Sequence, residues 1–309
     1  DIIVCRSEYP LDNGIKDKIA LFCNVPSSHV LQNLDVEYLY EAPLAMEEEH
    51  LAQVACECLG LPCPEPNLSD WKAMCTALKH PKGEVSVALV GKYTQLHDAY
   101  ISVVESLKHG GIANGVSVNI KWVDSEKVTA ENVEEFLGDV SGIIVPGGFG
   151  DRGIEGMIQS IRYAREKKVP FLGLCLGMQL TIVEFTRDVV GYNDAHSVEF
   201  LPGTTHPVIH LMPDQEGIDD IGGTLRLGSY PCILDESSKA YALYGSKEIH
   251  ERHRHRYEVN NDFRNVLTEN GMLLSGISPD GRIVDMVELK DHPWFIGTQA
   301  HPEFKSRPN

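Results

Sequence analysis

The sequence is poor in positive charge. It has 27 lysine and arginine residues against 45 aspartate and glutamate residues, and its formal net charge is −18. Nucleic acids and anionic membranes are bound by basic surfaces, so this composition argues against both as general partners. No apolar run is long enough for a membrane span, and there is neither an internal repeat nor a low-complexity tract.

Paired-cysteine motifs are also missing. The chain has eight cysteines but no Cys-x-x-Cys, and the spacing of Cys56, Cys58, Cys63 and Cys75 is not that of a zinc ribbon. We therefore expect no metal site, and free thiols in the reducing cytoplasm. The opening residues, 1–5, resemble a strand rather than a signal peptide, and the first is Asp, so we expect a piece of a longer chain.

What is present is a globular composition with a change of pattern near residue 84. Apolar residues make up 42% of the sequence, enough for a sizeable core. Residues 1–40 have too little apolar surface to fold alone and look like the end of a domain. Residues 41–84 read as a linker with helices at Ala45–Leu59 and Trp71–Lys79, separated by a proline-rich stretch.

From residue 85 to 309 strands and helices alternate. Expected strands are Val85–Val90, Val116–Val123, Ser141–Val145 and Val169–Leu174, with helices Asp98–His109, Ala130–Leu137 and Ile154–Lys168 between them. Further strands are expected at His206–Met212, Thr224–Leu227, Met272–Ile277, Ile283–Glu288 and Trp294–Gln299. The fold class is therefore α/β, a parallel-rich central sheet flanked by helices with a small N-terminal appendage, and ligands are expected at the carboxyl ends of its strands.

The centre of this pattern is Cys175, in Gly173-Leu-Cys-Leu-Gly177 between a buried strand and an apolar helix. This is the nucleophile-elbow arrangement with Cys in place of Ser. The two glycines allow strand and helix to approach around a strained turn, and the helix aims its free N–H groups at the sulfur, which favours a thiolate. The alternative is a free cysteine that acts as a small hydrophobe.

A thiolate that attacks acyl groups needs a base, a group that orients the base, and donors for an oxyanion. His301 and Glu303 follow the strand Trp294–Gln299 and share one face in an extended backbone, so they suit the first two roles. The loop Gly147-Gly-Phe-Gly150 ends the preceding strand, and with the N–H of Leu176 it suits the third. Each motif alone also fits a polar strand end or a tight turn.

The residues Pro146-Gly-Gly-Phe-Gly150, Gly173-Leu-Cys-Leu-Gly-Met-Gln179 and His301-Pro-Glu303 resemble the class I (triad) glutamine amidotransferases. Ser106-Leu-Lys-His-Gly-Gly111, Gly222-Gly-Thr-Leu-Arg-Leu-Gly228 and Glu251-Arg-His-Arg-His-Arg256 are similar to the CTP synthase family. The resemblance implies a flavodoxin-like fold. It also implies that residues 1–40 are the C-terminal remnant of an amidoligase domain, 41–84 an interdomain linker and 85–309 a glutamine amidotransferase domain.

By this resemblance glutamine is hydrolysed through a γ-glutamyl thioester. Cys175 is then the nucleophile, His301 the base and Glu303 its orienter, with Gly148 and Leu176 as the oxyanion hole. The implied glutamine contacts are Gly148, Leu176, Gly177, Met178, Gln179, Glu199 and Arg256. Arg256 suits the substrate carboxylate and Glu199 its ammonium group. Without the resemblance, residues 251–256 would read as a solvated basic patch or an anion site, and Glu199 as a surface carboxylate.

The resemblance further implies that the ammonia serves the ATP-dependent amination of UTP to CTP, in pyrimidine biosynthesis. The sites for ATP, Mg²⁺ and UTP fall outside this chain, so we expect no cofactor here and no CTP from this chain alone. GTP is implied as an activator, with Phe149, Arg152 and the Gly222–Gly228 lid as candidate contacts. The implied partners are L-glutamine, the amidoligase domain and further copies of the chain in tetramers or filaments.

Two other functions fit the same residues. The first is a separate Cys-His-Glu amidase or γ-glutamyl hydrolase, against which the linker and the amidoligase remnant argue. The second is a regulatory or assembly module without catalysis, against which the joint presence of Cys175, His301 and Glu303 argues.

Overall fold

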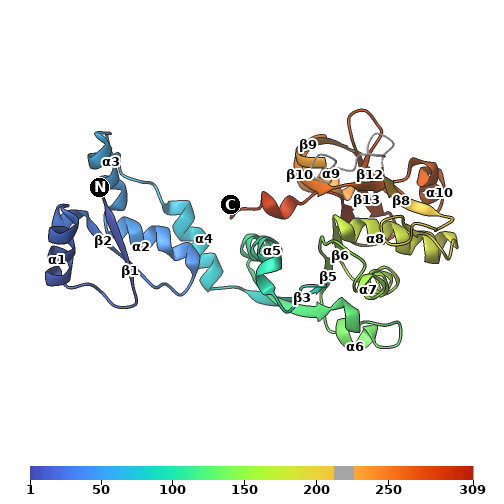
Figure 1. Ribbon diagram of the computed structural model, residues 1–309, viewed down its shortest axis with the longest axis horizontal. Helices are drawn as coiled ribbons and strands as arrows, with labels where there is room; N and C mark the ends of the chain where they lie inside the picture. The colour runs from blue at the N-terminus through green and yellow to red at the C-terminus, as the bar shows by residue number, and fades with distance from the viewer. Residues whose placement is uncertain (212–225, 309) are drawn as a thin grey trace. The chain divides into compact units, whose positions relative to one another are not determined.

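The structure is a computed structural model that describes residues 1–211 and 226–308. The chain divides into two compact units, unit 1 with residues 1–81 and unit 2 with residues 82–309 (Figure 1). None of the described helices has both the length and the apolar character needed to cross a membrane.

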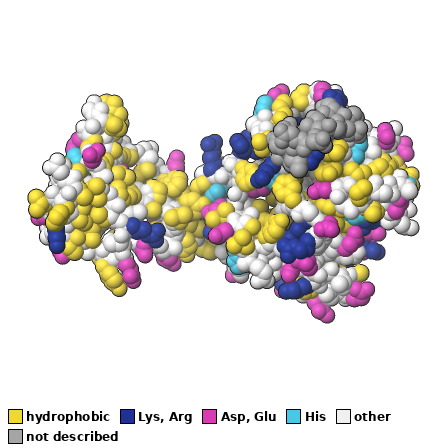
Figure 2. All heavy atoms as spheres, in the orientation of Figure 1, with side chains coloured by type: hydrophobic (Ala, Val, Ile, Leu, Met, Phe, Trp, Pro, Cys, Tyr) yellow, Lys and Arg dark blue, Asp and Glu magenta, His cyan; other side chains and the backbone are white. Residues whose placement is uncertain are grey.

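Unit 1 is built from a two-stranded parallel sheet and short helices. Its elements are β1 (Ile3–Ser7), α1 (Asn13–Cys23), β2 (Val30–Leu34), α2 (Ala42–Glu48), α3 (Leu51–Leu59) and α4 (Ser69–Lys79). Several of its apolar side chains are exposed, among them Leu21 and Phe22 of α1, each 79% exposed. Figure 2 shows hydrophobic side chains spread over the visible face of this unit.

The single helix expected over Ala45–Leu59 is wrong, because α2 ends at Glu48 and α3 starts at Leu51. His50 between them has a φ of 58° in the left-handed region. The carboxylate of Glu49 accepts hydrogen bonds from the Lys16 ammonium at 3.0 Å and from the Gln32 side-chain amide at 2.8 Å. These contacts hold the chain at a bend that helical periodicity does not reveal.

The main sheet of unit 2 has nine strands among the described residues, in the order β10-β9-β12-β13-β14-β6-β5-β3-β4. Its strands are β3 (Gly83–Gly91), β4 (Val116–Asp124), β5 (Gly142–Val145), β6 (Phe171–Leu174), β9 (Arg226–Leu234), β10 (Glu248–His255), β12 (Met272–Ile277), β13 (Val284–Leu289) and β14 (Phe295–Thr298). The five from β4 to β14 run parallel, and the rest pair antiparallel. The predicted parallel-rich sheet is therefore confirmed.

Helices cover both faces of the parallel half. They are α5 (Ile101–Asn114), α6 (Val133–Leu137), α7 (Ile154–Lys167) and α8 (Leu176–Phe185), while α9 (Lys239–Tyr244) and α10 (Arg264–Glu269) follow later. Ala88 and Val90 of β3 pack in the apolar cluster that contains α7 and α8, whereas Leu89 packs with Val103 of α5 on the other face. Because adjacent residues of a strand point to opposite faces and helices cover both faces, these strands need near-continuous apolar runs.

A small second sheet of unit 2 contains β7 (His196–Ser197), β8 (Pro207–Leu211) and β11 (Tyr257–Val259). β11 directly follows β10, so one continuous stretch of chain joins this sheet to the edge of the main one. The strand expected at Thr224–Leu227 begins at Arg226 among the described residues and is longer, while residues 222–225 of the expected lid lie outside them. β10 and β11 were not predicted.

Candidate active site

Cys175 lies at a strained turn between β6 and α8, as the sequence predicts. Its backbone has φ 51° and ψ −99°, a conformation that non-glycine residues rarely adopt. The flanking glycines are required by close packing. A Cβ on Gly173 would lie 2.7 Å from the carbonyl carbon of Gly177, and one on Gly177 would lie 2.1 Å from the Val145 oxygen.

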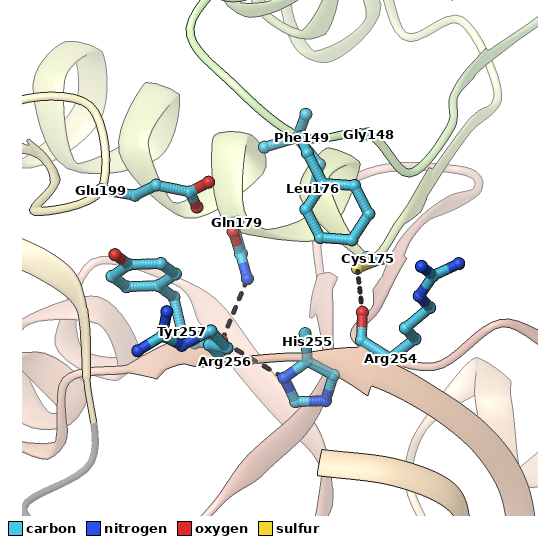
Figure 3. Close-up of a pocket in the computed structure, with 10 residues that line it drawn as sticks. All are labelled: Gly148, Phe149, Cys175, Leu176, Gln179, Glu199, Arg254, His255, Arg256 and Tyr257. Atoms are coloured by element: carbon cyan, nitrogen blue, oxygen red, sulfur yellow. Dashed lines mark hydrogen bonds between the residues drawn. The ribbon is translucent and has the colours of Figure 1, made fainter. Parts of the chain in front are cut away.

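Besides His301, the sulfur of Cys175 has two hydrogen-bond partners of opposite kind. The thiol faces the backbone oxygen of Arg254 in β10 at 3.9 Å, as Figure 3 shows. The side-chain amide nitrogen of Gln299, just after β14, lies 3.6 Å from the same sulfur. The nucleophile is thus enclosed by both halves of the sheet, and its side chain is buried.

His301 and Glu303 come together with Cys175. Nδ1 of His301 lies 2.7 Å from Oε1 of Glu303. A Cβ on Gly147 would lie 2.8 Å from Cε1 of His301 and 3.5 Å from Cβ of Cys175, so this glycine leaves room for both side chains. Burial lowers the pKa of His301, but hydrogen bonds and charge from Cys175 and Glu303 outweigh it and raise this pKa to about 10.

A lysine side chain holds the loop that follows β5. Nζ of Lys92, at the end of β3, donates to the backbone oxygen of Phe149 at 3.0 Å and also to that of Gly150. Burial lowers the pKa of Lys92, which is opposed by the nearby Glu199 carboxylate. Leu176 is the first residue of α8, where backbone N–H groups have no partner within the helix.

A cavity of about 390 Å³ opens at Cys175 and matches most of the predicted glutamine contacts (Figure 3). It is lined by Gly148, Phe149, Cys175, Leu176, Gln179, Glu199, Arg254, His255, Arg256 and Tyr257. A second cavity of about 230 Å³ shares Cys175 and Gly148 with it and is lined by His301 and Glu303. Cys175 therefore lines both cavities, whereas His301 lines only the second.

The two predicted charged contacts lie in the first cavity. Nε of Arg256 is buried and has no hydrogen-bond partner among the described residues. Burial raises the pKa of Glu199, while Lys92, the backbone at Gly150 and Arg256 act in the opposite direction. A guanidinium and a carboxylate in one cavity suit the two charged ends of a free amino acid.

Four predicted residues lie elsewhere or have other partners. Gly177 packs against the Val145 carbonyl, and Met178 is fully buried in the core, so neither lines the cavity. Phe149 is exposed beside the guanidinium of Arg254, with 5.7 Å between Cζ and the ring centroid. Arg152 pairs with Glu126 at 2.8 Å and lies 5.7 Å from the Tyr93 ring.

Sequence reasoning missed Lys92, Arg254, His255, Tyr257 and Gln299. Three of these belong to β10 and β11 or the link between them, the strands that were not predicted. The alternation of His and Arg over residues 252–256 carried the signal of a strand, since it repeats with period two.

Comparisons with known proteins agree with this geometry. Residues 95–309 match the family described as glutamine amidotransferase class-I, and residues 1–61 match the CTP synthase N-terminus. The curated CTP synthases of Clostridium acetobutylicum and Ruminiclostridium cellulolyticum are 58% and 57% identical over the whole of this chain. The chain spans 58% of the length of each of these relatives.

A solved structure described as the glutaminase domain of Trypanosoma brucei CTPS with bound acivicin is also similar. It is 37% identical, with a TM-score of 0.69, and the match covers 72% of this chain and 88% of that one. The chain therefore belongs to the class-I glutamine amidotransferases, and to the CTP synthase branch of that family.

Proposed function

We propose that this chain hydrolyses L-glutamine at Cys175 and supplies the ammonia for amination of UTP to CTP by the part of the enzyme outside the chain. The observation that carries the proposal is the arrangement around Gly147. This glycine lies close to a positive-φ cysteine at a helix N-terminus and also to a histidine that is paired with a carboxylate.

The chemistry begins with attack of the Cys175 thiolate, whose proton His301 has taken, on the side-chain carboxamide carbon of glutamine. A His301 pKa of about 10 means that the ring is protonated at neutral pH and can give its proton to the departing nitrogen. The C–N bond breaks, ammonia leaves and a thioester remains. Water then attacks the thioester carbon while His301 takes a proton from it, and glutamate is released. Glu303 stabilises the imidazolium through Nδ1.

The oxyanion would be bound by the N–H groups of Gly148 and Leu176. Lys92 supports this role because it draws the Phe149 and Gly150 carbonyl oxygens toward itself and so fixes the loop. A preformed loop places its donors before the reaction starts, which is where electrostatic catalysis gains most. The second cavity, which is lined by both Cys175 and His301, would admit the hydrolytic water.

For substrate binding we assign Arg256 to the α-carboxylate and Glu199 to the α-ammonium group. The unpartnered Nε of Arg256 supports the first assignment, and the position of Glu199 in the same cavity supports the second. Gly148 and Leu176 would line the side-chain end. Gly177 and Met178 would act indirectly, by packing that fixes the elbow.

The remaining assignments follow from the relatives. We propose residues 1–40 as the end of an amidoligase domain and residues 41–84 as a linker. The exposed apolar side chains of unit 1, such as Phe22, are what a fragment of a larger domain would show. ATP, Mg²⁺ and UTP would bind the part not spanned here. GTP would act near Phe149 and Arg152, and copies of the full enzyme would assemble in the cytoplasm.

The experiment is a glutaminase assay of the chain, with and without GTP, beside an assay with a γ-glutamyl peptide. We expect glutamine turnover that GTP increases, little peptide cleavage, and no CTP from ATP, UTP and ammonia. Preferential cleavage of the peptide would favour the separate γ-glutamyl hydrolase. No turnover of either substrate would favour a regulatory or assembly module.

A further inference from the structure

Gln299 contacts the sulfur of Cys175 but has no role in the mechanism proposed for glutamine hydrolysis. It follows β14 and is fully buried, and its backbone N–H donates to the backbone oxygen of Asp285 at 2.8 Å. Its Nε2 lies 3.6 Å from Sγ of Cys175. A buried primary amide beside a nucleophile is a polar group whose orientation decides whether it donates to the sulfur or repels a charge on it.

The orientation of this amide follows from a chain of contacts that starts at the backbone. The oxygen of Tyr257 lies 3.0 Å from the end of the Gln179 side chain, and a carbonyl oxygen only accepts. The Gln179 atom at that contact must therefore be its NH₂ nitrogen. The same nitrogen lies 3.2 Å from the amide of Gln299, which must present its oxygen there. Only the NH₂ group of Gln299 is left to face Cys175.

This network also settles what Gln179 does. Its two N–H donors are directed at Tyr257 and Gln299, so neither is free for a substrate. Figure 3 shows the side chain of Gln179 extending from α8 toward the backbone at Tyr257. Gln179 lines the cavity but acts as the link between a fixed carbonyl and the amide beside the sulfur.

The two partners of the sulfur other than His301 favour different protonation states. The Arg254 oxygen at 3.9 Å accepts from an S–H group, and a thiolate has no hydrogen to give it. The Gln299 nitrogen at 3.6 Å donates, and its hydrogen bond strengthens when the sulfur carries a negative charge. On deprotonation Cys175 therefore exchanges one contact for the other without moving.

We propose that Gln299 is a catalytic residue, whose amide donates a hydrogen bond to the Cys175 thiolate, and that Gln179 is the positioning residue that orients it. This proposal rests on Cys175 being the nucleophile of the proposed function. The charged and titratable side chains that line the two cavities with Cys175 are His301, Glu303, Arg254, His255, Arg256, Glu199, Tyr93, Tyr100 and Tyr257.

The test measures the thiolate directly and needs no glutamine. The full chain 1–309 is treated with iodoacetamide from pH 6 to pH 10, and alkylation of the peptide that contains Cys175 is followed by mass spectrometry. Gln299→Met removes the donor at similar length. Gln299→Glu keeps an acceptor for Gln179 and places a carboxylate beside the sulfur. Ser275→Ala, at a buried hydroxyl without a partner among the described residues, is the matched control.

We expect Gln299→Met to raise the pH midpoint of Cys175 alkylation, so that the rate at pH 7 falls roughly three- to tenfold. The rate at pH 10 should return to within about twofold of wild type, because the thiolate is then formed without help. Gln299→Glu should shift the midpoint further, and Ser275→Ala should leave it unchanged. Circular dichroism and thermal unfolding establish that each protein is folded.

Two results would overturn the proposal. One is a wild-type midpoint in either folded Gln299 variant. The other is slowing by the same factor at every pH, which would mean altered access to the sulfur. If one variant does not fold, the other decides alone. Glutamine turnover by the wild-type chain is measured on the same samples. Its absence beside a shifted midpoint would contradict the proposed function while the Gln299 contact stands.

Discussion

The two halves of the main sheet are stabilised by different kinds of interaction. The parallel half, from β4 to β14, is closed by apolar side chains and by glycines that let backbones touch, as at Gly177. The antiparallel half buries charged and polar side chains instead. Nη1 and Nη2 of Arg226 donate to the two oxygens of Asp285 at 2.5 and 3.3 Å, and His253 and His255 lie beside them.

The difference explains how the site divides its tasks. The apolar half holds the nucleophile rigidly at a strained turn, which only dense packing can maintain. The polar half turns the backbone of β10 and β11 toward the sulfur and provides Arg256. Burial and the charge of Arg226 lower the pKa of His253 to about 3, so this histidine is neutral and Asp285 is the counter-charge of Arg226. The parallel half therefore provides the chemistry, and the antiparallel half provides much of the substrate recognition.

The largest expected effect lies in the first half. Cys175→Ala removes the nucleophile but changes the backbone strain at this positive-φ position only slightly, so the fold should persist. The kcat for glutamine hydrolysis should fall by roughly 10⁴-fold or more. Steady-state assays check this, with Cys23→Ala, at an exposed cysteine of unit 1, as the control that should keep full activity. Residual turnover near the wild-type rate would remove Cys175 from the mechanism.

In the second half, Asp285→Asn should destabilise unit 2 by about 3–5 kcal/mol, because it leaves the Arg226 charge buried without its counter-charge. Glu236→Gln breaks the exposed pair with Lys247 and should leave the free energy of unfolding close to that of wild type, because solvent screens this pair. Urea unfolding of both variants measures the contrast. Equal and small effects would mean that the antiparallel half does not depend on its buried charges.

Gly177→Ala tests the packing of the first half. The added Cβ would meet the Val145 oxygen, which belongs to the backbone of β5 and cannot rotate away. We expect a loss of about 1–3 kcal/mol and of most activity. Gly110→Ala in α5 meets nothing within 4 Å and should stabilise the helix by roughly 0.5–1 kcal/mol. A Gly177→Ala variant as stable and active as wild type would contradict the close approach of elbow and β5.

Arg256→Lys is expected to have the smallest of these effects and to act on binding. A lysine keeps the charge but loses the forked contact to a carboxylate, so KM for glutamine should rise about tenfold with kcat little changed. Arg252→Lys, at an exposed position of β10, is the matched control. A fall in kcat at constant KM would place Arg256 in the chemical step rather than in recognition.

The sequence predicted the parallel half far better than the antiparallel one. β3, β5 and β6 are apolar runs bounded by glycine or proline, and Cys175 is marked by two glycines at fixed spacing, so local pattern and tertiary structure agree. β10 buries Glu251, His253 and His255, residue types that normally indicate a surface. The partners of His253, Arg226 and Asp285, come from distant parts of the chain, and no local pattern pairs them.

Within the site, the sequence predicted the residues that belong to a recognisable motif. It did not predict the residues whose role depends on a contact in the folded chain. His301 and Glu303 are two residues apart and do pair, but the extended backbone expected for them is wrong, because Glu303 lies in the 3₁₀ turn Pro302–Phe304 after His301. Gln299 and Lys92 act through atoms of loops far away in the sequence, and their roles depend on distances that only the folded chain has. The break at His50 likewise depends on Lys16 and Gln32 holding Glu49.

The most direct test of the central claim is covalent labelling with a chloroketone analogue of glutamine, followed by peptide mass spectrometry. The chain has eight cysteines, of which three are exposed and Cys175 is buried. We predict a single adduct on Cys175 that excess glutamine prevents and that Arg256→Lys slows. Labelling spread over the exposed cysteines, with Cys175 unmodified, would contradict a glutamine-binding nucleophile at this turn.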